Sequence, residues 1–340
     1  MRAIAITSTD GPEVAALHEL PLPEPAPGEV RIALAASALN RADLWVTRGM
    51  PRIERRFPFV LGLDGAGAID AVGAGVPAER IGEEVVVNPV LSCGRCARCV
   101  AGERMLCRRF TALGEHRDGT HADAVCVPAV CAVPRPPALS PLAAAAGATV
   151  WATAYRMLFT RARILPGEVC LVHGIGGGLA TAALQLARVA GATCVVTSSD
   201  DAKLERARAL GAAHVVNYRA GDVVQEVRAA VGAVDVVVDS VGAAVWPATF
   251  RLLAPGGRLV NCGITGGAEG TVPITHLFWR QFEVLGSTLA SDGEFRAALA
   301  AVVANGLEPV IDRTVALEGV PEALLALDRG EQFGKIVVTR

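Results

Sequence analysis

The second half of the chain alternates short apolar runs with amphipathic segments, and this alternation constrains the fold more than any other feature. Continuous valine-rich strands that alternate with helices are typical of a parallel sheet covered on both faces. We predict strands at 169–173, 193–197, 214–217, 234–239, 257–262 and 283–287, and helices at 178–190, 202–210 and 222–231.

A glycine-rich turn joins the first of these strands to the first helix. It reads Gly174-Ile175-Gly176-Gly177-Gly178-Leu179-Ala180. Glycines let the backbone turn tightly and approach a pyrophosphate, whose charge the helix N-terminus stabilises. A glycine run alone is weak evidence. Between a valine-rich strand and an amphipathic helix, it predicts a dinucleotide-binding site.

The end of the second predicted strand favours NADPH over NADH. An acidic residue there would hydrogen-bond the ribose of NADH and repel a 2′-phosphate. This sequence instead has Ser198 and Ser199, with Lys203 one turn into the helix, and hydroxyl groups with a cation suit a phosphate. Asp200 and Asp201 stand where a helix N-cap is expected, so we interpret them as capping residues.

Four of the nine cysteines lie close together, at Cys93, Cys96, Cys99 and Cys107. Four thiolates at this spacing can close a tetrahedron around zinc and leave no position for substrate. The prediction is one structural zinc in a lobe at about 92–110, with an iron–sulfur cluster as the alternative. The odd cysteine count argues against a disulfide framework.

The first third of the chain has a different pattern. Short β segments at 30–34, 67–72 and 84–87 are bounded by glycine and proline, which is typical of a barrel-like β domain. At roughly 150 residues per domain, 340 residues suggest about two domains. The tail from Asp292 adds a helix, an extended segment at 309–317, a second helix and a final strand at 335–339.

Charge and hydropathy exclude several functions. Lys plus Arg number 32 against 34 Asp plus Glu, and no stretch concentrates the basic residues. We therefore predict no nucleic-acid partner and no membrane partner. The longest uncharged stretch, 138–155, lacks the sustained hydrophobicity of a membrane span. Residues 1–10 lack the pattern of a secretory signal, so we expect a cytoplasmic protein.

These features together resemble the medium-chain dehydrogenase/reductase family, the group of zinc alcohol dehydrogenases and quinone oxidoreductases. The resemblance covers nearly the whole chain. Besides the cysteine lobe and the glycine turn, the matching motifs are Pro23-Glu24-Pro25, Pro58-Phe59-Val60-Leu61-Gly62-Leu63-Asp64-Gly65, Gly119-Thr120-His121-Ala122-Asp123, Ala209-Leu210-Gly211-Ala212, Leu285-Gly286-Ser287 and Gly334-Lys335-Ile336.

The resemblance implies an α/β protein with two domains. A GroES-like distorted β-barrel catalytic domain, which carries the zinc lobe, is expected at 1–150 and 291–340. A Rossmann domain with a doubly wound parallel sheet is expected at 151–290. By family analogy alone, the protein is expected to form a homodimer or a homotetramer.

The chain departs from the zinc alcohol dehydrogenases at the catalytic metal. Their first ligand is a cysteine at the position of Asn40, and their proton-relaying hydroxyl falls at Ala42. Their second ligand is a histidine at the position of Leu63, and the third falls near Thr149. Catalytic zinc needs three good ligands and one open position. The resemblance therefore implies that the catalytic zinc is absent and the structural zinc is kept.

Without a Lewis acid, a carbonyl reaction loses charge stabilisation at oxygen. Reduction of an activated alkene is less demanding, because conjugation delocalises the enolate and one or two hydrogen-bond donors can hold it. The zinc-free quinone and enone reductases of the family are similar in keeping an asparagine at the position of Asn40. We therefore predict NADPH-dependent reduction of a C=C bond in a quinone, enone or enoyl thioester.

In this prediction the substrate is small, apolar and conjugated. Asn40 is the hydrogen-bond donor, Trp45 is a wall of the pocket, and water supplies the proton. A zinc-independent carbonyl reductase or alcohol dehydrogenase is the alternative enzyme. A non-catalytic NADPH-binding protein is the alternative from another functional class.

The resemblance also implies nicotinamide contacts at the carboxyl ends of strands, where open α/β sheets bind their ligands. Tyr218, after the third strand of the parallel sheet, and Lys335, near the C-terminus, are further candidates for contact with the cofactor. The candidates at the ends of the later strands are Val241, Gly242, Cys262, Gly263 and Ser287.

Overall fold

The computed structural model describes residues 1–51 and 53–340. The chain divides into two compact units. The β-rich unit contains Met1–Ala152 and Ala290–Arg340, and the parallel-sheet unit contains Thr153–Leu289. The sequence placed these boundaries at 150/151 and 290/291.

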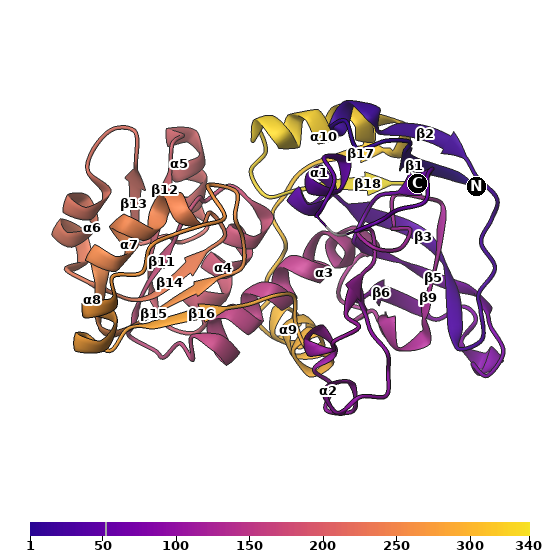
Figure 1. The fold of residues 1–340 in the computed structure, drawn as a ribbon, viewed down its shortest axis with the longest axis horizontal. Coiled ribbons are helices and arrows are strands. Elements are labelled where there is room, and N and C mark those ends of the chain that lie inside the picture. The colour runs from indigo at the N-terminus through magenta and orange to yellow at the C-terminus, as the bar shows by residue number, and fades with distance from the viewer. Residues whose placement is uncertain (52) are drawn as a thin grey trace. The chain divides into compact units, whose positions relative to one another are not determined.

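The parallel-sheet unit contains a six-stranded sheet in the order β13-β12-β11-β14-β15-β16, and every neighbouring pair is parallel. The predicted parallel sheet is therefore confirmed. Helices α4 to α7 flank the sheet (Figure 1). The strands are β11 (Val169–Val172), β12 (Thr193–Ser198), β13 (His214–Asn217), β14 (Val234–Asp239), β15 (Leu253–Asn261) and β16 (Glu283–Gly286), and the helices are α4 (Gly178–Val189), α5 (Asp201–Ala209), α6 (Val223–Val231), α7 (Trp246–Leu252) and α8 (Ile274–Trp279).

Valine and leucine side chains of these strands form the core of the parallel-sheet unit. Leu171, Val195, Val237 and Leu259, one from each of four neighbouring strands, are fully buried in a single cluster. Burial on both faces explains why the strands read as continuous apolar runs rather than as alternating ones.

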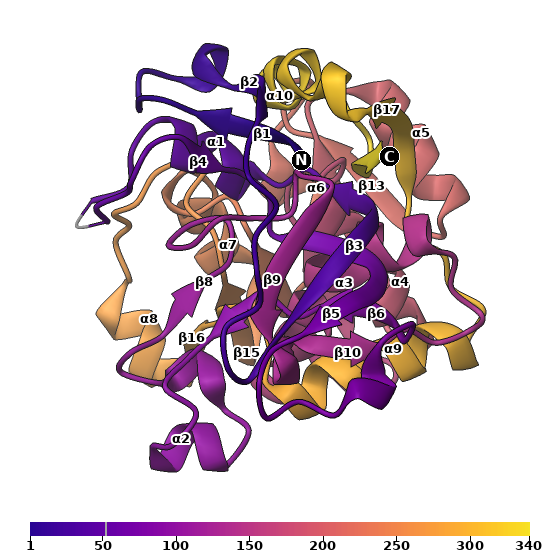
Figure 2. The same cartoon turned by 90° about the vertical axis from the view of Figure 1, so that its right-hand side faces the viewer.

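The β-rich unit is built around a seven-stranded sheet in the order β10-β6-β5-β3-β18-β17, with β9 also paired to β3. Figure 2 shows β3, β5 and β9 side by side. The strands of the whole β-rich unit are β1 (Arg2–Ile6), β2 (Ala16–Glu19), β3 (Glu29–Ala38), β4 (Phe59–Val60), β5 (Asp64–Val72), β6 (Glu84–Val87), β7 (Val90–Leu91), β8 (Thr111–Ala112), β9 (Ala124–Pro128), β10 (Ala132–Pro134), β17 (Ile311–Ala316) and β18 (Lys335–Thr339).

The last strand of the chain lies in the same sheet as β3, between β3 and β17. β18 pairs antiparallel with β3, with Val337 opposite Ala38. This pairing carries the start of β18, Lys335, to the segment that follows β3, at Asn40. Two residues almost 300 positions apart in the sequence therefore meet.

Four helices of the β-rich unit are α1 (Arg41–Thr47), α2 (Ala97–Val100), α9 (Asp292–Ala304) and α10 (Val320–Arg329). A further helix, α3 (Pro141–Tyr155), crosses the boundary between the units and continues into a π-helical turn at Arg156–Arg161. No helix was predicted there, because side chains buried around the helix leave no amphipathic period. Among the described residues, no helix is long enough and apolar enough to span a bilayer.

Candidate active site and cysteine lobe

The glycine turn after β11 has the backbone geometry that a bound pyrophosphate requires. Gly174 and Gly176 have φ angles of 69° and 128°, which favour glycine. Gly177 is the N-cap of α4, no side chain caps this helix end, and a Cβ at Gly177 would meet nothing within 4 Å. The first N–H groups of α4 therefore lack a side-chain acceptor, and the turn fits an anionic ligand.

The loops after β14 and β15 are tied together by Asp239. Its fully buried carboxylate accepts hydrogen bonds from the backbone N–H groups of Val241 and Gly242, at 2.7 and 3.0 Å. It also accepts from Asn261 Nδ2 at 2.8 Å and from Trp246 Nε1 at 2.9 Å. Asp239 was not among the predicted site residues. Its signal was an acidic residue at the carboxyl end of a valine-rich strand.

The residues predicted to select NADPH lie at the end of β12. Asp200 caps α5 by accepting from the N–H groups of Ala202 and Lys203, which confirms its capping role. Ser198 is buried and its Oγ accepts from the Asp200 N–H at 3.2 Å. Ser199 is half-buried, so its hydroxyl is the more accessible of the two. Lys203 lies over the glycine turn, since its Cδ would be 2.9 Å from a Cβ on Gly176.

The remaining cofactor candidates lie just beyond strand ends of the same sheet or in the first turn of α4. Ile175 is buried and donates its N–H to the Thr197 carbonyl, while Tyr218 is 49% exposed. Their contacts with a cofactor stay predictions. The structure distributes the candidates as follows: Leu179 and Ala180 in the first turn of α4, Val241 and Gly242 after β14, Cys262 and Gly263 after β15, and Ser287 after β16.

A hydrogen-bonded cluster in the β-rich unit brings together Asn40, Asp64, Thr149 and Lys335. The Lys335 ammonium lies 2.6 Å from Asn40 Oδ1, 2.9 Å from Asp64 Oδ2 and 2.7 Å from the Leu39 carbonyl oxygen. Asn40 Nδ2 donates to Asp64 Oδ2 at 2.9 Å. Thr149 donates its N–H at 3.0 Å and its hydroxyl to Asp64 Oδ1. We call these four residues the Asp64 cluster.

Two of the three positions at which the family resemblance implies catalytic-metal ligands, Asn40 and Thr149, belong to the Asp64 cluster and hydrogen-bond to Asp64. The third, Leu63, directly precedes Asp64 and is buried. The side chains of the cluster are a carboxamide, a carboxylate, a hydroxyl and an ammonium. This set provides neither thiolate nor imidazole and already contains a cation, so it does not fit a catalytic zinc site.

From the sequence, Lys335 is expected to contact the cofactor, and no partner is predicted for Asp64. In the structure, Lys335 directs its three ammonium protons to three oxygen atoms of the β-rich unit. The side chains of both residues are almost fully buried. Each is a charged residue in an apolar segment, and this pattern signals a buried ion pair because an unpaired buried charge is costly.

The neighbouring helix α1 carries the other predicted catalytic residue. Trp45 lies on α1 and is half-buried. Buried Asp43 accepts from the backbone N–H of Asn40 at 2.7 Å and of Gly62 at 3.0 Å. Asp43 therefore ties the start of α1 to the loop that precedes β5. The predicted chemical roles of Asn40 and Trp45 stay predictions.

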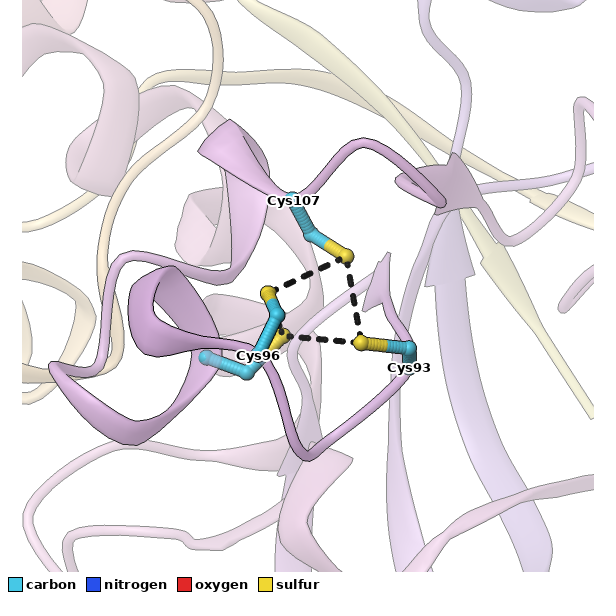
Figure 3. Close-up of side chains that lie close together, drawn as sticks. Cys93, Cys96 and Cys107 are labelled. Carbon is cyan, nitrogen blue, oxygen red and sulfur yellow. Dashed lines mark hydrogen bonds between the residues drawn. The ribbon is translucent and has the colours of Figure 1, made fainter.

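The four clustered cysteines meet in the loop around α2. Figure 3 shows Cys93, Cys96 and Cys107 with their sulfur atoms turned toward one another. Their four Sγ atoms lie within 4.8 Å of one another. The Cys96–Cys99 and Cys93–Cys107 pairs are 3.5 Å apart, and the Cys93–Cys99 and Cys96–Cys107 pairs are 3.8 Å apart. A tetrahedral zinc with Zn–S bonds of about 2.3 Å has S–S edges of about 3.8 Å. The sulfur positions therefore fit a closed tetrahedral site.

The electrostatics and the anchoring of the lobe also suit a metal site. Backbone N–H groups of Arg95 and Cys96 lower the pKa of the Cys93 thiol to about 6, so this one thiolate forms readily. The pKa of Cys96 is raised to about 11, because the lowering by the backbone N–H of Cys99 is outweighed by the neighbouring thiols and by burial. Buried Arg104, inside the lobe, donates to Asp292 at 2.6–2.8 Å and to the Val90 carbonyl at 2.6 Å. This side chain fastens the lobe to the first residue of α9.

Comparison with known proteins identifies the family. Residues 178–304 match the zinc-binding dehydrogenase family and residues 26–137 match the alcohol dehydrogenase GroES-like domain. The chain is 32% identical, over 92% of its length, to a zinc-type alcohol dehydrogenase-like protein of Schizosaccharomyces pombe, 91% of which is covered. This chain belongs to the medium-chain dehydrogenase/reductase family. The predicted fold class, a GroES-like domain with a Rossmann-like parallel sheet, is confirmed.

Two solved structures show how this dehydrogenase/reductase compares with its relatives. A crystal structure of an NAD-dependent alcohol dehydrogenase is 43% identical, with a TM-score of 0.94 and full coverage of both chains. A 2-octenoyl-CoA carboxylase reductase in complex with NADP and 2-octenoyl-CoA is 25% identical, with a TM-score of 0.92, and the match covers 99% of this chain and 87% of that one. NAD(P)-dependent oxidoreduction is supported by both.

Proposed function

We propose that this medium-chain dehydrogenase/reductase is an NADPH-dependent reductase of an activated C=C bond in a quinone, an enone or an enoyl thioester. One observation carries the proposal. At the positions of the family's catalytic metal ligands, the chain has the Asp64 cluster, whose donors suit hydrogen bonding to an oxygen rather than binding of a Lewis-acid metal.

The reaction in this proposal adds a hydride and a proton across the double bond. NADPH, when bound, supplies the hydride to the β-carbon, and the electron pair of the C=C bond moves toward the conjugated carbonyl oxygen. Asn40 donates a hydrogen bond to that oxygen, which stabilises the enolate as its charge develops. For an enone, protonation by water at the α-carbon completes the reduction. For a quinone, the enolate oxygen takes a proton from water; the ring carbon that received the hydride then loses a proton and the second oxygen gains one, which gives the hydroquinone. Trp45 forms an apolar wall beside the substrate.

The preference for NADPH rests on the end of β12. The hydroxyl of Ser199 and the ammonium of Lys203 suit the 2′-phosphate, with Ser198 shaping the turn between them. The complex of the enoyl-CoA carboxylase reductase with NADP supports this preference by likeness. The name of the 43% identical relative, which is NAD-dependent, favours the other cofactor. The remaining contacts are those expected at Tyr218, Val241, Gly242, Cys262, Gly263 and Ser287.

A single zinc per chain, held by the four lobe cysteines, is the second part of the proposal. Its role is structural, because four thiolates fill the tetrahedron and leave no place for water or substrate. The proposal also includes a small apolar substrate, no nucleic-acid or membrane partner, a cytoplasmic location and a homodimer or homotetramer. The assembly rests on family analogy alone.

A zinc-independent carbonyl reductase or alcohol dehydrogenase is the second candidate. The names of the relatives favour it, since both the fission-yeast protein and the 43% identical structure are described as alcohol dehydrogenases or as like them. In this case the hydride goes to the carbonyl carbon and the alkene is left intact.

Product analysis separates the two candidates. The purified protein is incubated with NADPH and cinnamaldehyde, and in parallel with a simple quinone. We expect the saturated aldehyde and the hydroquinone. Cinnamyl alcohol as the main product would contradict the proposal and favour the carbonyl reductase. Binding of NADPH without turnover of either substrate or of an enoyl thioester would support the non-catalytic alternative.

A further inference from the structure

The Lys335 ammonium is unusual in its surroundings and in its chemistry. It is almost fully buried and makes all three of its hydrogen bonds to oxygen atoms at 2.6–2.9 Å. The chain has 30 arginines and only two lysines. An ammonium is a compact point charge, whereas a guanidinium is a planar fork. A pocket with three oxygens converging on one nitrogen therefore suits lysine and excludes arginine.

Lys335 and Asp64 together determine how the Asn40 carboxamide is oriented. An ammonium can only donate hydrogen bonds and a carboxylate can only accept them. Asn40 must therefore present Oδ1 to Lys335 and Nδ2 to Asp64, as the distances of 2.6 and 2.9 Å record. A flipped carboxamide would face the ammonium with its NH₂ group and the carboxylate with its oxygen, and both contacts would be repulsive.

One of the two Nδ2 protons of Asn40 makes a longer hydrogen bond than the rest of this carboxamide. Nδ2 donates to the Ala38 carbonyl at 3.3 Å, beyond the usual range for a good N–H···O bond. Asn40 is also half-buried, whereas Asp64 and Lys335 are almost fully buried. This is the proton that a substrate oxygen can take over. A cation bound to Oδ1 polarises the amide and strengthens the bond that Nδ2 donates.

We propose that Lys335 is a positioning residue that supplies, through Asn40, the positive charge that the catalytic metal supplies in the zinc enzymes of the family. Its ammonium locks the carboxamide with Nδ2 as the donor and polarises that donor toward the substrate oxygen. Asp64 balances the buried charge and fixes the second proton of Nδ2. This inference rests on the proposed role of Asn40 as the donor.

A double-mutant cycle tests whether Lys335 acts through Asn40. One arm is Asn40→Ala. The other is the paired change Lys335→Met with Asp64→Asn, which removes both buried charges and leaves neither alone. In the otherwise native chain we expect the paired change to lower kcat about 10- to 100-fold, as loss of a hydrogen bond to a charged group does, with KM for NADPH unchanged. In the Asn40→Ala background, we expect it to lower kcat less than about threefold.

The control is the exposed ion pair of Arg48 with Asp328, changed to Met and Asn. It lies in the same unit, and kcat should stay at the native value. The inference would be overturned if the paired change lowered kcat by the same factor with and without Asn40→Ala. It would also be overturned if the paired change raised KM for NADPH and left kcat unchanged. The second result would mean that Lys335 contacts the cofactor. The cycle uses whichever substrate is turned over, so it can fail or succeed independently of whether a C=C or a C=O bond is reduced.

Side-chain NMR provides a readout that needs no turnover. The chain has five asparagines, and the NH₂ signals of Asn40 are those lost in Asn40→Ala. We expect two separate, slowly exchanging signals in the native protein, and faster exchange in Lys335→Arg and in the paired variant. Unchanged signals in these variants would overturn the inference even if the protein reduces nothing. Fast exchange in the native protein would overturn it as well.

Discussion

Asp64 and Lys335 are each the one charged residue of an apolar segment, at 61–69 and 335–338. Their burial could be predicted from that pattern, because such charges are stable in a core only when they are paired. Their partnership could not be predicted, because it spans 271 positions and depends on the pairing of β18 with β3. The cation beside Asn40 was therefore missed, although both residues lie within motifs that carry the family resemblance.

In the proposed function, cofactor preference depends on single residues at the end of β12. The change Ser199→Asp adds a carboxylate at a half-buried position where a 2′-phosphate is expected. Because like charges repel, we expect the preference, measured as kcat/KM for NADPH over kcat/KM for NADH, to fall about 10- to 100-fold. Steady-state kinetics with the two cofactors measure this ratio.

Ser199→Ala is the matched control, since it removes the hydroxyl without adding charge. We expect a change in preference of less than about fivefold. An unchanged preference in Ser199→Asp would place the phosphate away from β12.

His173 gives the stability of the protein a pH dependence. It is buried with its ring nitrogens near the hydroxyls of Thr197 and Thr249, and burial lowers its pKa to about 4. The unfolded chain, with an ordinary histidine pKa of about 6.5, binds more protons between pH 4 and 6.5. The contribution of neutral His173 to stability is therefore complete above pH 6.5 and is lost as the pH falls toward 4.

The change His173→Gln should remove this dependence. Between pH 6.5 and 4, we expect the free energy of unfolding of the native protein to fall more steeply than that of the variant, by at most about 1.4 kcal/mol per pH unit. Urea unfolding at several pH values measures both slopes. The control, His214→Gln on β13, should keep the native slope. Equal slopes in the native protein and in His173→Gln would show that the imidazole does not carry this effect.

At the scale of elements, the strands and helices of the parallel-sheet unit were the most predictable. Strands β11, β12, β13 and β14 have long apolar runs bounded by turns, and their observed limits lie within one residue of those predicted. Strands such as β1 and β10 were not predicted, because no alternating helices mark them and they obtain part of their order from pairing with distant segments, Ala5 with Val60 and Ala132 with Val87. Helix α3 was not predicted either, because its burial on all sides removes the amphipathic signal.

The cysteine lobe is an element whose order depends on its sulfur ligands. In Cys99→Ser, a hydroxyl replaces a thiolate whose Sγ lies 3.5 Å from Cys96 and 3.8 Å from Cys93. We expect zinc content to fall from about one per chain to below about 0.2, and the melting temperature to fall by several degrees, because structural zinc contributes folding energy. Elemental analysis and thermal unfolding measure these two changes.

Cys194→Ser is the control for the lobe. Cys194 is equally a buried cysteine, but it lies on β12 in the other unit. It should keep about one zinc per chain. A native protein that reproducibly carries two zinc ions would contradict the absence of a catalytic metal site. Full zinc content in Cys99→Ser would contradict the four-cysteine assignment.

At the scale of the whole molecule, the chain builds one unit from both of its ends and inserts the other between them. The change of pattern near residue 150 is visible in the sequence because strand and helix signals start to alternate there. The reaction is harder to infer from family membership, because the named relatives include both alcohol dehydrogenases and an enoyl-CoA carboxylase reductase. The Asp64 cluster is the feature on which the choice between them depends.

The position of a transferred deuterium distinguishes C=C reduction from C=O reduction. Cinnamaldehyde is reduced with NADPH that carries deuterium at the transferable position, and mass spectrometry locates the label in the product. We expect the label at the β-carbon of the saturated aldehyde, because the Asn40 donor stabilises an enolate. A label at the carbonyl carbon of cinnamyl alcohol would show that the chain reduces carbonyl groups without the family's catalytic metal, and would contradict C=C reduction as its function.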